Sequence, residues 1–258
     1  MPITNSCNME QSNKLYIKHL SIEVTRRCNM SCAHCMRGDA EQTDIAHCHI
    51  RNILKHTQHI SRFNITGGEP SLVPKTIHYI LQQLKSFDIT VGNFYLVTNG
   101  SLSSISDQFI KACVALYDYQ EDKEQHPRSH MLEMSDDRFH DKSHHSDVIE
   151  ILGCYPFFGL RGQSENIFLF KEGRSKDGYP NPVHPIYLTE TNSVYGDVYL
   201  NAEGKILGNG DLSYRRQRKH ILCDSKCFLK YLQETLKKRQ SYPQKEPSQY
   251  NRHKSVFG

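Results

Sequence analysis

Apolar residues in this chain follow two periodicities that alternate along its first two thirds. Six short stretches alternate apolar with polar residues or form brief apolar blocks, as β-strands do; they are residues 20–24, 63–66, 94–97, 131–134, 155–160 and 167–170. In the intervening segments 45–58, 74–84, 104–116 and 147–152, apolar residues recur three and four positions apart, which predicts helices. Strands alternating with helices in this way predict βαβ units and a parallel sheet.

Six such strands predict an α/β fold, a partial (β/α)6 TIM-like barrel over residues 18–175. The pattern then changes, because residues 198–200 and 205–207 predict a hairpin and residues 227–239 predict one more amphipathic helix. These elements form a small C-terminal hairpin-plus-helix extension, residues 176–240, which we expect to face the substrate. We expect residues 1–17 to be a loose N-terminal lead-in and residues 241–258 to be a disordered tail.

Composition bears on the location of the protein and on the use of its cysteines. A hydrophobic content of 37% and a mean hydropathy of −0.62 indicate a lean core, which favours a partly open architecture. No stretch approaches the roughly 20 apolar residues that span a bilayer, and residues 1–14 lack the apolar centre of a signal peptide. We therefore expect a cytoplasmic protein with no membrane partner. That compartment keeps thiols reduced, so we interpret clustered cysteines first as metal ligands or reactive thiols and not as disulfides.

Three cysteines share one short loop directly after the first predicted strand. Cys28, Cys32 and Cys35 have the spacing C-x3-C-x2-C. Three thiolates can hold three irons of a four-iron four-sulfur (4Fe-4S) cluster, and with no fourth cysteine nearby the fourth iron stays open to another ligand. The alternative is a zinc site, which needs four ligands. His34 is the available fourth ligand, but it adjoins Cys35 and would point away from a shared tetrahedral centre.

Polar residues also follow the second, third and fourth predicted strands. Gly67-Gly68-Glu69-Pro70 ends the second strand, Asn99 follows the third, and Ser135 and Asp137 follow the fourth. Paired glycines allow a close approach of the backbone, and Glu69 offers a charge-assisted acceptor to an ammonium group. All these residues stand at carboxyl ends of strands, the face on which barrel enzymes build active sites.

The cysteine spacing, with His34 before the third cysteine, resembles the signature of the radical S-adenosylmethionine (SAM) superfamily. The resemblance covers about residues 20–160 and implies two cofactors, a 4Fe-4S cluster and SAM. It implies that the cluster binds Cys28, Cys32 and Cys35, and that SAM binds Gly67, Gly68, Glu69 and Pro70 through its amino group, lies near Asn99, and contacts Ser135 and Asp137 through its ribose. In such an enzyme the reduced cluster cleaves SAM to methionine and a 5′-deoxyadenosyl radical, which takes a hydrogen atom from the substrate.

The resemblance leaves the substrate and the final reaction open. The hairpin-bearing extension favours modification of a peptide or protein. The alternatives are an activating enzyme that installs a glycyl radical on a partner protein and an enzyme that modifies a nucleotide or RNA. Outside enzymes, the alternative is a zinc-binding protein that uses the same cysteines. Radical SAM chemistry also implies an electron donor of the flavodoxin or ferredoxin type.

Charge is unevenly distributed along the chain. Residues 205–258 hold 13 Lys and Arg against 4 Asp and Glu, a net charge of +9, whereas the remainder holds 19 against 24, a net charge of −5. Arg215, Arg216, Arg218 and Lys219 form a basic cluster in this region. Such a cluster predicts an anionic partner, either RNA or an acidic peptide. A solvated helix face is the alternative.

Several weaker signals concern single residues. Cys223 and Cys227 lie four positions apart, and a second metal site there would lack ligands. Arg174, after the sixth predicted strand, is a candidate partner for the SAM carboxylate or an anionic substrate, with a surface salt bridge as the alternative. Arg138 and His140 follow the fourth strand at the presumed active face, in a histidine-rich stretch that we otherwise expect to be a solvated loop.

Overall fold

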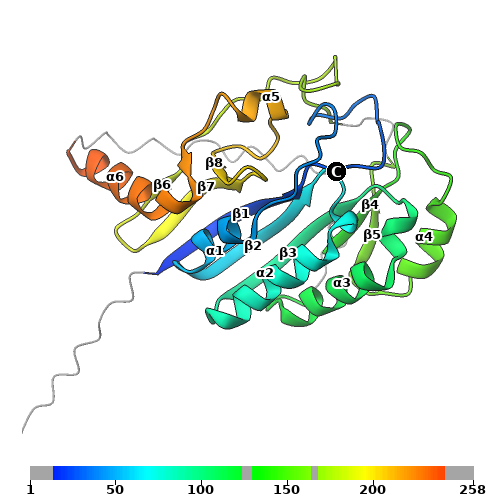
Figure 1. The fold of residues 1–258 in the computed structure, drawn as a ribbon, viewed down its shortest axis with the longest axis horizontal. Helices are drawn as coiled ribbons and strands as arrows, with labels where there is room; N and C mark the ends of the chain where they lie inside the picture. The colour runs from blue at the N-terminus through cyan, green and yellow to red at the C-terminus, as the bar shows by residue number, and fades with distance from the viewer. Residues whose placement is uncertain (1–13, 124–129, 164–167, 242–258) are drawn as a thin grey trace, which may run out of the picture.

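The computed structural model describes residues 14–123, 130–163 and 168–241, and one sheet runs through this part of the chain. Its strands follow the order β5-β4-β3-β2-β1-β7-β8-β9, and β6 pairs with β7 (Figure 1). The strands are β1 (Leu15–Thr25), β2 (Thr57–Gly67), β3 (Thr90–Thr98), β4 (Leu132–Ser135), β5 (Phe158–Arg161), β6 (Tyr187–Leu188), β7 (Ser193–Leu200), β8 (Lys205–Leu207) and β9 (Cys223–Asp224). The helices are α1 (His47–Leu54), α2 (Pro74–Ser86), α3 (Asp107–Tyr119), α4 (His145–Leu152), α5 (Tyr214–Gln217) and α6 (Phe228–Ser241), with short 3-10 turns η1 (Pro70–Leu72), η2 (Leu102–Ile105) and η3 (Ser225–Cys227).

Strands β1 to β5 are parallel, and α1 to α4 follow them in alternation along the chain. Parallel neighbours need such crossovers, which return the chain to the same end of the sheet. Apolar side chains of strands and helices form one buried cluster, in which Ile65 and Leu96 from the sheet join Ile77 and Leu116 from α2 and α3. The sheet is open, with β5 at one edge and β9 at the other. The predicted α/β, TIM-like partial barrel is thus confirmed as an open sheet.

The sixth parallel strand is β7, and the prediction that residues 167–170 form it is wrong for the residues described. β7 pairs with β1 in parallel, on the side of β1 opposite to β2. The segment after β5 instead makes a turn, in which the Tyr179 N–H donates to the Leu169 carbonyl at 2.9 Å. The rings of Phe168 and Tyr179 stack 4.6 Å apart. These aromatic residues therefore pack on one another in a turn, although their sequence has the composition of a strand.

The C-terminal hairpin is confirmed, but it continues the main sheet. β7 and β8 pair antiparallel, β8 pairs with β9, and α6 lies against β6. β1 begins at Leu15, within the expected lead-in, and α6 continues to Ser241. Ser241, the first residue of the predicted tail 241–258, is therefore helical, whereas residues 1–13 and 242–258 lie outside the described residues. In the part of the chain that is described, no helix is long and apolar enough to cross a membrane.

Candidate active site

The three cysteines of the C-x3-C-x2-C motif lie on the loop between β1 and α1, residues 26–46, which we call the cysteine loop. Cys28, Cys32 and Cys35 are all half-buried free thiols. Burial raises the pKa of Cys28, and the nearby charges of Glu69, Cys35 and Cys32 raise it further. A bound metal ion would offset this rise at Cys28, because a coordinating metal deprotonates its thiols outright.

The start of the cysteine loop is held by Arg26, whose side chain is completely buried. Its guanidinium group contacts Glu23 at 2.7 Å, Glu41 at 2.8 Å, Glu203 at 2.9 Å and the Gln217 side-chain oxygen at 2.8 Å. Glu41 belongs to the loop itself, Glu203 to the β7–β8 turn and Gln217 to α5. Arg26 therefore joins β1, the cysteine loop and the C-terminal extension at one point.

Glu23 completes this buried network from the sheet. Its carboxylate accepts hydrogen bonds from the Tyr199 hydroxyl at 2.5 Å, the Gln217 amide at 2.9 Å and the Ala202 N–H at 3.0 Å. A buried charge needs such partners, because removal from water is costly. We did not predict this network from the sequence. The available signal was an acidic residue inside an apolar strand, three positions before an arginine.

The basic cluster of the C-terminal region is partly used inside the protein. Arg216 contacts the buried carboxylate of Glu172 at 2.7 Å, and Arg218 contacts Glu41 at 2.7 Å. Arg215 and Lys219 are exposed. Two of the four residues that predicted an anionic partner therefore pair with carboxylates of the chain itself, and one of these carboxylates is on the cysteine loop.

Gly67 and Gly68 place the end of β2 directly against the start of the cysteine loop. The Gly68 N–H donates to the Thr25 carbonyl at 2.8 Å, and the Glu69 N–H donates to the Arg27 carbonyl at 2.8 Å. A Cβ atom on Gly67 would lie 2.5 Å from the Thr25 oxygen, and one on Gly68 would lie 2.2 Å from the Arg27 oxygen. The glycines are thus required for this contact between two backbone segments. From the sequence we had explained them by the close approach of a ligand.

The Glu69 carboxylate binds groups of the protein. Its side chain is buried, with 1% of the residue exposed. One oxygen accepts from the Ser71 N–H at 3.0 Å and the Thr98 hydroxyl at 2.9 Å, and the other accepts from the Asn99 N–H at 2.8 Å. Burial raises the pKa of Glu69, and these hydrogen bonds oppose the rise. The carboxylate therefore joins the ends of β2 and β3, and its role as an acceptor for an ammonium group stays a prediction.

Asn99 reaches from the end of β3 to the cysteine loop. Its side-chain amide donates to the Asn29 side-chain oxygen, Oδ1, at 2.9 Å and lies 3.8 Å from the Cys28 sulfur. Its own oxygen accepts from the Ser101 N–H at 3.1 Å. The strand-end residue predicted for the SAM site is thus adjacent to a predicted cluster ligand.

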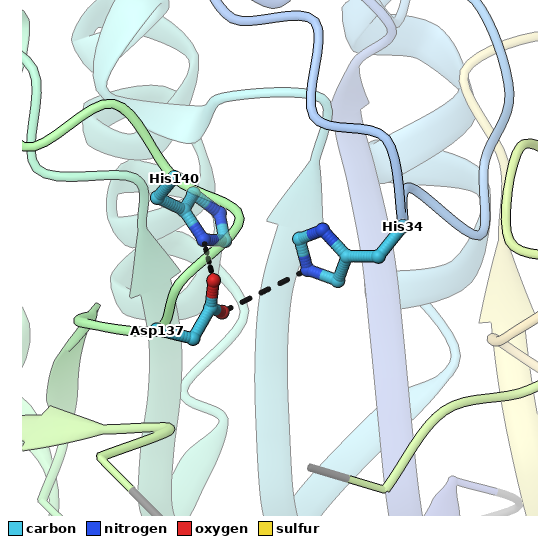
Figure 2. A group of neighbouring side chains, drawn as sticks. All are labelled: His34, Asp137 and His140. Atoms are coloured by element: carbon cyan, nitrogen blue, oxygen red, sulfur yellow. Dashed lines mark hydrogen bonds and ion pairs between the residues drawn. The ribbon is translucent and has the colours of Figure 1, made fainter. Parts of the chain in front are cut away.

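Asp137 and His140 approach the cysteine loop from the end of β4, as Figure 2 shows. Asp137 accepts from His140 Nδ1 at 2.8 Å and from the Phe139 N–H at 2.8 Å, and its second oxygen lies 3.7 Å from His34 Nε2. Burial alone would raise the pKa of Asp137, but these hydrogen bonds lower it to about 2. Burial alone would lower the pKa of His140, but its interactions with Asp137 and Cys32 raise it to about 9. Ser135, at the end of β4, is buried.

Two buried polar atoms beside the cysteine loop lack a hydrogen-bond partner. They are His34 Nδ1 and Arg174 Nε, and they are the only such side-chain atoms in residues 14–123, 130–163 and 168–241. Arg174 is also bound to the loop, because its backbone N–H donates to the Cys35 carbonyl at 2.9 Å and its guanidinium group contacts Asp39 at 3.2 Å. Buried polar atoms are normally paired, so two orphaned ones here are what a bound ligand would explain. The three thiols and the unpaired polar atoms beside them fit a bound iron-sulfur cluster that carries a small-molecule ligand.

Other candidates from the sequence contribute less to this site. Burial and the nearby charge of Cys227 raise the pKa of Cys223 to about 12, so the two thiols are neighbours. The described residues contain one group of three metal-ligand side chains whose donor atoms lie within 4.8 Å of one another, which is His34, Asp137 and His140. Arg138 lies over the Phe139 ring at 5.0 Å. Of the histidine-rich stretch, His126 lies outside the described residues.

The chain is similar in sequence to two curated enzymes and in fold to a solved structure. No protein-family model matches the chain. It is 31% identical over 106 residues to GTP 3′,8-cyclase of Crocosphaera subtropica (strain ATCC 51142 / BH68), covering 37% of this chain and 31% of that protein. It is 34% identical over 84 residues to 7-carboxy-7-deazaguanine synthase of Haemophilus influenzae (strain ATCC 51907 / DSM 11121 / KW20 / Rd), covering 32% of this chain and 36% of that protein. The matched part thus spans about a third of each relative.

A solved structure described as native anSMEcpe with bound AdoMet and Cp18Cys peptide shares the fold. It has a TM-score of 0.54 at 14% identity, covering 86% of this chain and 82% of that one. The open α/β sheet and a cysteine-bearing loop after its first strand define the class of protein. The similarity to the two curated relatives, with this sheet and loop, indicates the radical SAM superfamily, whose members use a 4Fe-4S cluster and SAM.

Proposed function

We propose that this protein reductively cleaves SAM at a 4Fe-4S cluster held by Cys28, Cys32 and Cys35, and that the resulting radical modifies a peptide or protein. The observation that carries the proposal is the junction of the cysteine loop with the ends of β2 and β3. There the Asn99 side-chain nitrogen lies 3.8 Å from the Cys28 sulfur. The N–H groups of Gly68 and Glu69 donate to the carbonyls of Thr25, at the end of β1, and Arg27, on the loop. The ends of β1, β2 and β3 therefore meet where the cysteine loop begins, next to Cys28.

When bound, the reduced cluster would donate one electron to SAM, which would then split into methionine and a 5′-deoxyadenosyl radical. The protein's residues hold and orient these groups. The three cysteines bind three irons, and the backbone from Gly67 to Pro70 lies beside them to receive the SAM amino group. Arg174, with its orphaned Nε, is the candidate for the SAM carboxylate, and Ser135 and Asp137 are the candidates for the ribose.

The spacing of the sulfurs supports a cluster over the zinc alternative. Tetrahedral zinc bound by thiolates at ~2.3 Å places their sulfurs about 3.8 Å apart. Within the described ranges, the group with donor atoms all within 4.8 Å is His34, Asp137 and His140, and the three cysteines form no such group. At least one pair of their sulfurs therefore lies more than 4.8 Å apart, farther than two ligands of one zinc ion.

Two observations favour different substrates. The neighbour of similar fold was solved with a bound peptide, and the extension that suggested a peptide substrate packs directly against the cysteine loop, where Tyr214 N–H donates to the Arg37 carbonyl at 3.1 Å. The curated relatives are named for purine chemistry, GTP cyclisation and deazaguanine synthesis, which favours a nucleotide. We propose the peptide or protein first and the nucleotide second, with a glycyl-radical activating role as a further alternative and a flavodoxin- or ferredoxin-type electron donor in each case.

Release of 5′-deoxyadenosine tests the proposed reaction. Anaerobic protein reduced in the presence of SAM is expected to release 5′-deoxyadenosine and methionine in equal amounts, slowly without substrate. The Cys32→Ala variant is the control and is expected to release neither. A candidate peptide mixture or GTP is then added, and the substrate is the one that accelerates release. Release from Cys32→Ala at the wild-type rate would contradict the proposal.

A further inference from the structure

His145 bridges two strand ends that carry predicted SAM contacts. It is the first residue of α4, and its side chain is 5% exposed. Its Nε2 lies 3.3 Å from the Asn99 carbonyl oxygen, just after β3, and its Nδ1 lies 3.2 Å from the Asp136 carboxylate, just after β4. Both partners accept hydrogen bonds, so a ring nitrogen that carries a proton donates to the partner that it faces. We call this bridge the His145 clamp.

The surroundings fix the place of the His145 ring. Gly100 has a φ of +76°, and a Cβ atom there would lie 2.7 Å from Cδ2 and Nε2 of His145 and 2.7 Å from the Met134 sulfur. Glycine at this position therefore leaves the space that the ring occupies. The Asp136 end is anchored as well, because its backbone N–H donates to the Arg161 carbonyl at 2.8 Å. The ring thus lies between two strand ends that are each held in place.

The two ends of the His145 clamp lead to different parts of the proposed SAM site. On one side, the Asn99 side chain lies 3.8 Å from the sulfur of Cys28. On the other side, Asp136 stands between Ser135 and Asp137, the candidates for the ribose. The clamp therefore sets the spacing between the cluster side and the ribose side of the site. Such spacing matters for catalysis, because a misplacement of about 1 Å can cost roughly a hundredfold in rate.

We propose that His145 is a positioning residue, which joins Asn99 to Asp136 and so holds the two sides of the SAM site at the spacing that SAM requires. The inference rests on the proposed function, because it requires SAM to bind across these two strand ends. If His145 only stabilised the start of α4, its loss would lower stability and leave the SAM affinity of the folded protein unchanged.

Calorimetric titration of the reconstituted protein with SAM tests the inference, with iron content measured on the same samples. His145→Leu removes both contacts of the clamp, and we expect it to keep about four irons per chain and to bind SAM about tenfold more weakly. His145→Gln keeps an N–H donor and is expected to fall between His145→Leu and wild type.

Lys142→Leu is the matched control. Lys142 binds the same Asp136 oxygen at 2.7 Å, but it is 49% exposed, and of the two clamp partners it contacts Asp136 alone in the described part of the chain. We expect Lys142→Leu to leave the SAM affinity unchanged. Asp136→Ala removes one partner of the clamp, and its loss should not add to that of His145→Leu, because residues that act as one unit are not additive.

A His145→Leu variant with four irons and the wild-type SAM affinity would overturn the inference, as would an equal loss in Lys142→Leu or fully additive losses in the double variant. If His145→Leu fails to hold its cluster, Asp136→Ala decides, and a wild-type SAM affinity there overturns the inference. Failure of the proposed function looks different, because the wild-type protein itself would then bind no SAM.

Discussion

The cysteine loop meets the rest of the protein along two sides that differ in kind. Toward β7 and α5 it is joined by the buried network of Arg26 and Glu23, in which the charged groups find close partners. Toward the end of β4 its contacts are sparser, with His34 3.7 Å from Asp137 and one His34 nitrogen left unpaired although buried. The satisfied side stabilises the loop, and the unsatisfied side is where a ligand is needed.

Removing Arg26 should break the satisfied side with the largest effect. Arg26→Ala leaves the buried Glu23 without its cation, and breaking a buried pair in this way costs about 3–5 kcal/mol of unfolding free energy. Arg27→Ala is the matched control, because Arg27 and its partner Asp44 are 36% and 43% exposed and such pairs contribute about 0–1 kcal/mol. Urea unfolding of the two variants measures the difference. Equal losses would show that the network does not stabilise the loop.

The Glu69 carboxylate tests whether the end of β2 belongs to the satisfied side. Glu69→Ala leaves the buried N–H groups of Ser71 and Asn99 without their acceptor. We expect it to lower the unfolding free energy by about 2–3 kcal/mol and to weaken SAM binding as the strand ends move apart. Glu133→Ala removes another buried carboxylate, on β4, and is expected to lower stability while leaving SAM affinity intact. Calorimetric SAM binding and urea unfolding measure both. Weakened SAM binding at unchanged stability would instead make Glu69 a direct SAM ligand.

Glu172 provides a smaller, pH-dependent test of the contact between the extension and the rim of the site. Burial raises its pKa, but hydrogen bonds from Ser213 and Arg216 outweigh burial and lower it below the ordinary value of 4.5. Its ionised form therefore stabilises the fold above pH 4.5, and this contribution is lost as the pH falls through the lowered pKa. We expect Glu172→Gln to cost about 1–2 kcal/mol at pH 7 and progressively less below pH 4.5. A difference from wild type that is constant between pH 7 and pH 3 would contradict this.

The sequence predicted the parts of the molecule that local patterns control. Strand ends that carry Cys28, Gly67 and Asn99 were identified because parallel strands bring their carboxyl ends to one edge. The network of Arg26 was not predicted, since its partner Glu203 lies 177 positions away and periodicity carries no information about such pairs. Residues 167–170 were predicted to form a strand because they are mostly apolar. Phe168 instead stacks on Tyr179, a contact that composition does not reveal.

Iron and sulfide analysis of the anaerobically purified protein determines whether the cysteine loop holds a 4Fe-4S cluster. Wild-type protein is expected to contain about four irons and four sulfides per chain and to be brown. Cys28→Ala, Cys32→Ala and Cys35→Ala should each abolish this content, whereas a variant lacking both Cys223 and Cys227 should retain it. One zinc per chain with no sulfide would contradict the account.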